Sequence, residues 1–318
     1  MDKKSMNSKY KKFDLTKVKI LSIKDRKNLV SYKDFLKIKN LKEIRLKNFV
    51  NILPDILMAK ELKELLLLMK NAYKKNKPII IATGAHSIKC GLSPLFIELI
   101  RRKMISLIAL NGAGVIHDVE IALIGETSEK VDISIRDGSF GMAKETAEFI
   151  NSALEFGVNN NMGYGEAVGY FIDKKNLKYR KYSLLYNAYK NNVPVTVHIG
   201  IGTDIIHQQP STKGEIIGKA SYTDFLIYIE KLKEISDGGI YLNIGSNVIL
   251  PEVFLKAVTV IRNTNPDFKN FYTANFDMIK HYRPTTNVVH RPVLNGGKGF
   301  NFIGHNEIMI PLLFFSLF

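Results

Sequence analysis

The 318-residue sequence contains one cysteine, no tryptophan and no long hydrophobic run. Because a single cysteine, Cys90, cannot form an internal disulfide, the sequence excludes a disulfide framework, and a reducing cytoplasm is the expected location. The lysine-rich start lacks the apolar core of a secretory signal. No apolar run reaches the roughly 20 residues that span a bilayer. We therefore expect a cytoplasmic protein that does not contact a membrane.

Acidic residues are also scarce relative to basic ones. The sequence has 46 Lys and Arg against 30 Asp and Glu, which gives a formal net charge of +16. The lysines are spread over predicted helix faces, and no motif of interleaved basic and aromatic side chains accompanies them. We interpret the excess of basic residues as a compositional bias, and we regard nucleic-acid binding as the weaker hypothesis. A basic RNA-associated protein stays open as an alternative.

Residues 78–125 contain the clearest structural pattern. The apolar runs Ile79–Ile81 and Ile105–Leu110 each end in a small polar turn, and an amphipathic helix follows each turn. This alternation is typical of two consecutive βα units of a parallel sheet. We therefore expect an α/β fold, with a Rossmann-like parallel sheet and helices on both faces.

The rest of the sequence continues the alternation. Residues 1–48 are predicted to be a basic N-terminal arm and extension, and residues 49–318 a single α/β nucleotide-binding domain with a helical excursion at 142–191. Further strands are expected at 193–197, 239–244, 271–275 and 300–303. Residues 277–299 are expected to form a long loop, which in a compact domain is more often functional than idle.

Small polar residues follow the predicted strands at their carboxyl ends. In parallel sheets these ends meet at one edge, where backbone N–H groups and helix N-termini bind nucleotides. The Asn111 turn lacks the complete Gly-x-Gly-x-x-Gly fingerprint, because position 117 is histidine. The predicted cofactor residues of these turns are Thr83, Gly84, Asn111, Gly112, Ala113, Gly114, Gly202, Asp204, Gly245, Ser246, Asn247, Asn275 and Asp277.

Candidate catalytic residues come from the histidines and one lysine. Most of the seven histidines lie at predicted turns, and we predict that His117 or His290 moves protons. Lys298 lies among glycines, which would allow its amine to enter a cleft as a nucleophile; a solvated lysine on a flexible loop is the alternative. His305 and Glu307 with His290 suggest a metal site, but no established ligand spacing supports it, so we predict no metal.

The order and spacing of several motifs resemble deoxyhypusine synthase over most of the chain, from about Ile79 onward. Residues 111–118 (NGAGVIHD) stand where that family has TAGGVEED. Residues 193–204 resemble its IPV strand leading into TDGS, residues 273–275 its TAQ, and residues 310–313 its closing FPLL helix. Ile244–Gly245–Ser246 occupies the place of its GGG turn.

The resemblance implies a Rossmann-like domain that binds NAD and assembles as a tetramer with sites at subunit interfaces. It places Ser87, Asn111, Gly112, Ala113, Asp118, Asp204, Gly245, Ser246 and Asn275 at the NAD site. The family oxidises spermidine with NAD and passes a four-carbon amine fragment through an enzyme lysine in a WGK triplet, downstream of an RP pair. Here Arg291–Pro292 and Lys298 stand nearest to that pattern.

This sequence departs from the family where it binds the polyamine. The tryptophan of the triplet is absent, Val293–Leu294–Asn295 replace the expected acidic residues, and His117 replaces a carboxylate. We predict an NAD-dependent enzyme that transfers or oxidises a small amine-containing substrate, without predicting hypusine formation itself. The alternatives are an NAD-binding relative without catalysis and the RNA-associated protein named above.

Overall fold

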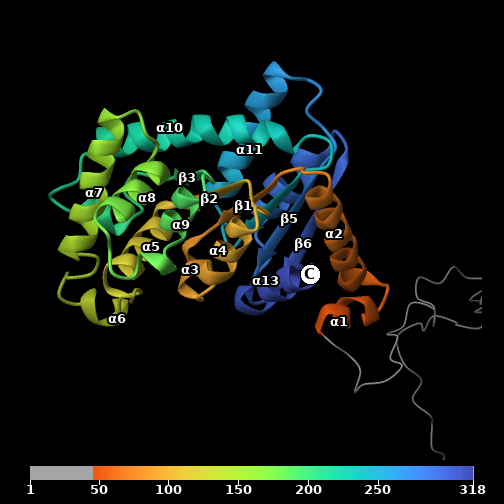
Figure 1. Cartoon of the computed structure of the whole chain (residues 1–318), viewed down its shortest axis with the longest axis horizontal. Helices are drawn as coiled ribbons and strands as arrows, with labels where there is room; N and C mark the ends of the chain where they lie inside the picture. The colour runs from red at the N-terminus through yellow and green to blue at the C-terminus, as the bar shows by residue number, and fades with distance from the viewer. Residues whose placement is uncertain (1–45, 318) are drawn as a thin grey trace, which may run out of the picture.

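A six-stranded parallel sheet forms the centre of the protein (Figure 1). The computed structural model describes residues 46–317, so most of the predicted N-terminal arm lies outside the described part. The strand order is β3-β2-β1-β4-β5-β6, which confirms the Rossmann-like fold. The strands are β1 (Ile79–Thr83), β2 (Leu107–Asn111), β3 (Val195–His198), β4 (Ile240–Ile244), β5 (Phe271–Asp277) and β6 (Gly297–Ile303).

The central strands are short apolar runs because helices cover the sheet on both sides. Every residue of β1, β3 and β4 is buried, which is the pattern of a parallel sheet with two covered faces. On one face, Ile80 and Tyr241 pack with Phe254 and Leu232. On the other face, Ile81 and Leu242 belong to a second, larger hydrophobic cluster.

The helices divide between these two faces and a lobe beside β3 (Figure 1). Side chains of α10 and α11 form the first cluster, and those of α2, α4, α5, α9 and α13 contribute to the second. The helices are α1 (Leu46–Ile52), α2 (Leu57–Lys74), α3 (Ala85–Lys89), α4 (Ser93–Arg101), α5 (Gly112–Ile124), α6 (Val131–Ser134), α7 (Lys144–Asn159), α8 (Tyr164–Lys174), α9 (Leu184–Lys190), α10 (Gly214–Leu232), α11 (Ile249–Thr264), α12 (Tyr282–Pro284) and α13 (Asn306–Phe315).

The segment predicted as a loop, residues 277–299, is mostly ordered into helical turns, so that prediction is wrong. It contains α12, a π-helix η7 (Thr285–His290), a 3-10 turn η8 (Arg291–Val293) and the start of β6. Val288 and Val289 are buried, and the Thr273 hydroxyl donates a hydrogen bond of 2.7 Å to the Val288 carbonyl oxygen. These contacts with the sheet, rather than local helical propensity, fix the segment.

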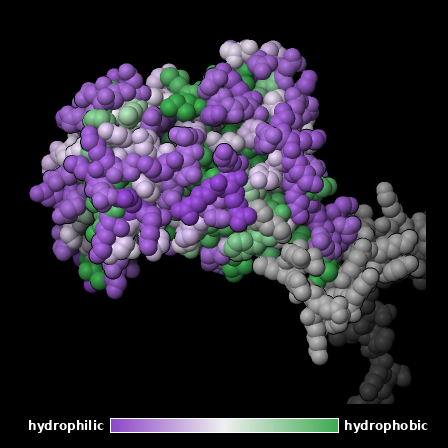
Figure 2. Space-filling model, in the orientation of Figure 1, coloured by the Kyte–Doolittle hydropathy of each residue, from purple (hydrophilic) through white to green (hydrophobic). Residues whose placement is uncertain are grey.

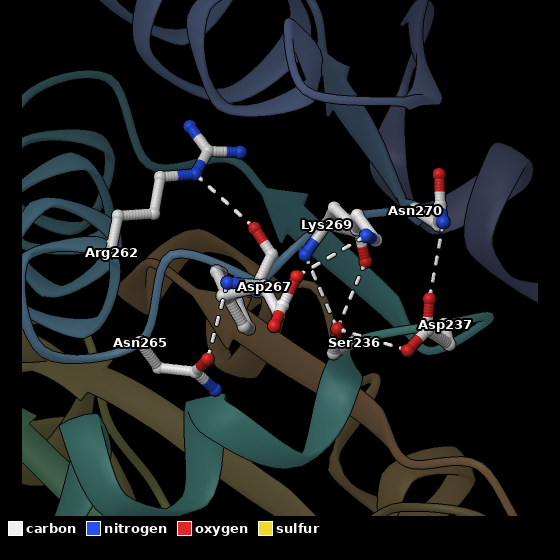
Figure 3. A network of polar contacts seen from close by, with 8 residues as sticks. Ser236, Asp237, Arg262, Asn265, Asp267, Lys269 and Asn270 are labelled. Carbon is white, nitrogen blue, oxygen red and sulfur yellow. Dashed lines mark hydrogen bonds and ion pairs between the residues drawn. The ribbon is translucent and has the colours of Figure 1, made fainter.

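The turns before β4 and β5 are tied together by polar contacts at the amino edge of the sheet (Figure 3). The Ser236 hydroxyl accepts the backbone N–H of Lys269 and donates to its carbonyl oxygen. Asn270 donates to the Asp237 carboxylate at 3.1 Å, and the Gly238 N–H bonds the Asn270 carbonyl oxygen. These two turns are thus held together by the chain's own hydrogen bonds.

The face seen in Figure 2 is mostly hydrophilic, with small hydrophobic spots. One hydrophobic spot lies at the far end of the lobe. In and directly after α6, the side chains of Val131, Ile133 and Ile135 are exposed. Across residues 46–317, no helix combines the length and the apolar character needed to cross a membrane.

Candidate functional site at the carboxyl edge of the sheet

The turns that follow β1 and β4 approach each other closely. The Gly84 N–H donates to the Ile244 carbonyl oxygen at 3.0 Å, and a Cβ atom on Gly84 would lie 2.3 Å from the Gly245 carbonyl oxygen. Chain connections leave the sheet in opposite directions from these two strands, which is where open α/β sheets bind ligands. The strand ends therefore share one edge, as predicted from the turns.

The start of α5 brings the β2 and β3 turns together. The Asn111 side chain caps α5 by accepting the Gly114 N–H at 3.0 Å, and the Ala113 N–H donates to the Asp204 carboxylate. A Cβ atom on Gly112 would lie 1.9 Å from Asp204 Oδ2. Glycine is thus required at position 112 because the Asp204 carboxylate occupies the space that a side chain would fill.

Asp204 combines burial with an unused hydrogen-bonding atom. Its side chain is 7% exposed, and its Oδ2 has no hydrogen-bond partner among the described residues, although His207 Nε2 lies 3.8 Å away. Burial raises the pKa of the carboxyl to about 6, against which the Ala113 N–H acts. A buried carboxylate with a free oxygen and a raised pKa is typical of a functional site.

His207 supports the turn that carries Asp204. Its Nδ1 accepts the backbone N–H groups of Gly202 at 3.1 Å and of Asp204 at 3.2 Å. Burial lowers the pKa of His207, so the ring is neutral at pH 7. Of the predicted β3-turn residues, Asp204 is therefore held in place, whereas Gly202 is exposed.

A cavity of about 610 Å³ opens beside these residues, between the start of α5, the β3 turn and the α6 segment. Ala113, His117 and Asp204, three of the predicted site residues, line it. Its volume is in the range of small-molecule and cofactor sites, roughly 300–1,000 Å³.

His117 is held in the cavity wall by a chain of hydrogen bonds. Its Nδ1 lies 2.6 Å from the Thr127 hydroxyl oxygen, and that hydroxyl donates to the Glu120 carboxylate. Because the single hydroxyl proton is directed to Glu120, Nδ1 must carry the proton of the bond to Thr127. Nε2 is then the basic atom of the ring, an arrangement that suits a proton acceptor.

Carboxyl groups outnumber ammonium groups in the cavity wall. Glu120, Glu129 and Asp204 line it, together with Lys89. Burial raises the pKa of Glu120, but hydrogen bonds from His117 and Thr127 outweigh it and hold that pKa below its usual value. The sequence alone did not indicate Glu120, Thr127 and Glu129, because these residues form a site only where α5 and the α6 segment come together.

In the other half of the edge, the strands β4, β5 and β6 carry amide side chains near their carboxyl ends. Asn243, Asn275 and Asn301 occupy neighbouring positions on β4, β5 and β6, and their amides form hydrogen bonds of 2.7 and 2.8 Å across the sheet. Asn243 Oδ1 and Asp277 Oδ2 lack a partner within residues 46–317. These strand ends offer hydrogen-bonding atoms to a ligand.

The remaining predicted residues in these turns differ in exposure. The buried hydroxyls of Thr83 and Ser87 bond each other at 2.6 Å. The Ser246 carbonyl oxygen accepts the Asn243 amide, whereas Asn247 is exposed. Their roles in cofactor binding stay predictions.

Asp118 lies away from the cavity, and its carboxylate forms hydrogen bonds at the start of α9. It is fully buried, and its carboxylate accepts the Ser183 hydroxyl and the backbone N–H groups of Leu184 and Leu185, at 2.5, 2.6 and 3.1 Å. Both oxygens are therefore used at the start of α9. Its position corrects the expectation that it contacts the cofactor.

Lys298 and His290 are also misplaced by the prediction. Lys298 is the second residue of β6, five residues before the strand ends, which is about 16 Å from the carboxyl edge. Its ammonium group bonds Glu64 of α2 at 2.6 Å. His290 is exposed at the end of η7, next to η8, whose Pro292 carbonyl accepts Arg262 from the end of α11. Both residues lie where the chain returns toward the amino edge of the sheet.

We expect Lys298→Ala to have a small effect. The Lys298–Glu64 ion pair is 40% exposed on both sides, and pairs of this kind contribute about 1 kcal/mol or less to stability. The midpoint of urea unfolding should therefore change little, and ligand binding at the carboxyl edge should not change. A loss of borohydride-trappable imine in this variant would contradict the placement.

Comparisons with known proteins establish the fold alone. No protein-family model and no curated protein sequence matches the chain. Among solved structures, unliganded AgrE has 15% identity and a TM-score of 0.53, with 89% of this chain and 34% of AgrE covered. AgrE in complex with ornithine and NAD+ has 16% identity and a TM-score of 0.51, with the same coverage. The chain thus spans about a third of AgrE.

A candidate deoxyhypusine synthase from Entamoeba histolytica is similar over nearly its whole length. It has 11% identity and a TM-score of 0.50, and the match covers 86% of this chain and 93% of that protein. The family resemblance read from the sequence is therefore supported as a relation of fold. Sequence identities this low do not carry the chemistry from one protein to the other.

Proposed function

We propose that the protein is an NAD-dependent enzyme that oxidises a small amine-containing substrate, with the dinucleotide bound along the carboxyl edge of the sheet. The observation that carries the proposal is the buried carboxylate of Asp204, which borders a cavity of about 610 Å³ and whose Oδ2, beside glycine 112, has no partner among residues 46–317 closer than His207 Nε2 at 3.8 Å. AgrE, which shares the fold, has been solved with ornithine and NAD+.

The residues at this edge fit a dinucleotide. The Asp204 carboxylate can accept ribose hydroxyls, and the turns at Gly84 and Gly245 present backbone without side chains at the point where the two halves of the sheet meet. His117 and three carboxyl groups, those of Glu120, Glu129 and Asp204, line the cavity near β2 and β3, so we place the reacting end of the cofactor there.

Bound NAD+ would supply the acceptor for a hydride from the carbon that carries the amine. His117 Nε2 takes the proton that the amine nitrogen loses, and the substrate becomes an imine. The Thr127–Glu120 chain holds the ring and stabilises its charged form. The excess of carboxyl groups in the wall attracts a cationic amine.

The structure lends no support to the transfer of a fragment through an enzyme lysine. Lys298, the lysine nearest to the family's pattern, lies at the start of β6 and is distant from the edge. Lys89 lines the cavity, but it belongs to α3 and not to the segment that the resemblance points to. We therefore propose oxidation rather than transfer. Assembly as a tetramer stays a prediction.

The proposal is tested by calorimetric titration of the full chain with NAD+. We expect binding at pH 7.5 and an affinity about 10-fold lower in Asp204→Asn, because one hydrogen bond to a charged group is lost. The affinity of the parent should fall as the pH decreases through about 6, where Asp204 is protonated, and that of the variant should not. An NAD+ affinity that is the same in both proteins at every pH would contradict the assignment.

A further inference from the structure

A second cluster of polar side chains lies on the same edge, outside the cavity. His86 and Cys90 are four residues apart along α3 and its C-terminal end, so both point to one side, and Glu307 comes from the first turn of α13. One ligand atom from each side chain lies within 4.8 Å of the others. Residues 217 positions apart in the sequence thus meet at one point.

The distances agree with a shared metal ion. Cys90 Sγ lies 3.1 Å from His86 Nε2 and 3.7 Å from Glu307 Oε2. Around a tetrahedral Zn²⁺, bond lengths of roughly 2.0–2.3 Å place neighbouring ligand atoms about 3.3–3.6 Å apart. Only small side-chain shifts separate the three atoms from that arrangement.

We propose that His86, Cys90 and Glu307 form a binding site for a divalent transition-metal ion, with Zn²⁺ as the occupant. A mixed nitrogen, sulfur and oxygen donor set suits Zn²⁺, whereas the thiolate excludes Mg²⁺ and Ca²⁺ as natural occupants. Binding forms a Zn–S bond as the Cys90 thiol releases its proton to solvent. Three protein ligands leave a fourth position open, as in catalytic rather than structural zinc sites.

The surroundings give the open position a polar setting. Asn306, which precedes Glu307, is 1% exposed, and neither its Oδ1 nor its Nδ2 has a partner within the described chain. Its Nδ2 lies 2.8 Å from the place of a Cβ atom on Gly245, and His86 Cβ lies 3.9 Å from the same place. An unpaired buried amide beside the cluster is what a bound water or anion would satisfy.

Two further charged groups lie near the cluster. His305 Nδ1 is 3.6 Å from the second carboxylate oxygen of Glu307, and Lys89 neighbours Cys90 in the chain. Lys89 is exposed and can turn toward solvent.

The metal site does not depend on the proposed NAD chemistry, because none of its ligands lines the cavity that holds His117 and Asp204. Metal content is measured without NAD and without a substrate. Binding of Zn²⁺ without binding of NAD+ would support the metal site and contradict the proposed function. Binding of NAD+ without binding of Zn²⁺ would support the proposed function and contradict the metal site.

The test uses the full chain, freed of any affinity tag and of metal, and then titrated with Zn²⁺ in competition with a chromophoric chelator. We expect one Zn²⁺ per chain, and an affinity lower by about 100-fold or more in Cys90→Ser and in Glu307→Gln, since each removes a direct ligand. Co²⁺ in place of Zn²⁺ should give a thiolate charge-transfer band that Cys90→Ser abolishes.

His290→Asn serves as the matched control, because it removes an exposed histidine on η7. Its Zn²⁺ affinity should equal that of the parent. Circular dichroism of each metal-free variant establishes that it is folded. Absence of Zn²⁺ binding by the folded parent, or equal affinity in Cys90→Ser, Glu307→Gln and the parent, would overturn the inference.

Discussion

Asp118→Ala is expected to lower the free energy of unfolding by about 3–5 kcal/mol. The carboxylate accepts one hydroxyl and two backbone N–H groups, all buried, and the alanine variant leaves these three donors without a partner. Each buried donor left unpaired costs about 1–3 kcal/mol. Urea unfolding followed by circular dichroism measures the change.

Two other variants separate the capping role of Asp118 from a general effect of substitution. Asp118→Asn keeps one oxygen acceptor and should lose less stability than Asp118→Ala. Asp173→Ala removes a carboxylate that forms a surface ion pair with Lys190 at 3.1 Å, and it should cost about 1 kcal/mol or less. Equal losses in Asp118→Ala and Asp173→Ala would show that Asp118 does not hold α9.

His117→Gln is expected to reduce the rate of amine oxidation by about 10²–10⁴-fold, the usual contribution of a positioned general base. The glutamine retains a polar side chain in the cavity wall but has no atom that accepts a proton at neutral pH. NAD+ affinity should change little, because the proposed ribose ligand is Asp204. Steady-state formation of reduced nicotinamide with a panel of small amines measures the rate.

Thr127→Val provides a test of how His117 acts. It removes the hydroxyl between His117 and Glu120, so the ring loses its orientation and the rate should fall while the base itself remains. A rate in His117→Gln equal to that of the parent would remove His117 from the mechanism.

Much of the fold could be predicted because strands that are buried on both faces of the sheet are apolar runs, and such runs can be recognised in the sequence. The apolar runs that became β1, β2 and β4 are buried on both sides, and each is followed by a small polar turn. The prediction for residues 277–299 was wrong because the structure of this segment depends on contacts with distant strands. Its two buried valines, 288 and 289, are held by β5 and β6, and such contacts between distant segments leave no local period.

The candidate site could be predicted only in part. Asp204 and His117 were predicted because they follow β3 and β2 along the chain, and both line the cavity. Lys298 was predicted to lie on a loop, where β6 already begins. Asp118 matches a family motif, but its role depends on α9, which lies 65 residues further along the chain. The His86–Cys90–Glu307 cluster joins α3 to α13 and has no signature in either segment alone.

A crystal structure of the chain soaked with NAD+ is the most direct test of the proposed cofactor site at the carboxyl edge of the sheet. We expect a ribose hydroxyl within hydrogen-bonding distance of Asp204 Oδ2, with the nicotinamide in the cavity beside His117 and the pyrophosphate near the Gly84 and Gly245 turns. Electron density for NAD+ at any other surface, or an Asp204 carboxylate that contacts no part of the bound dinucleotide, would contradict it.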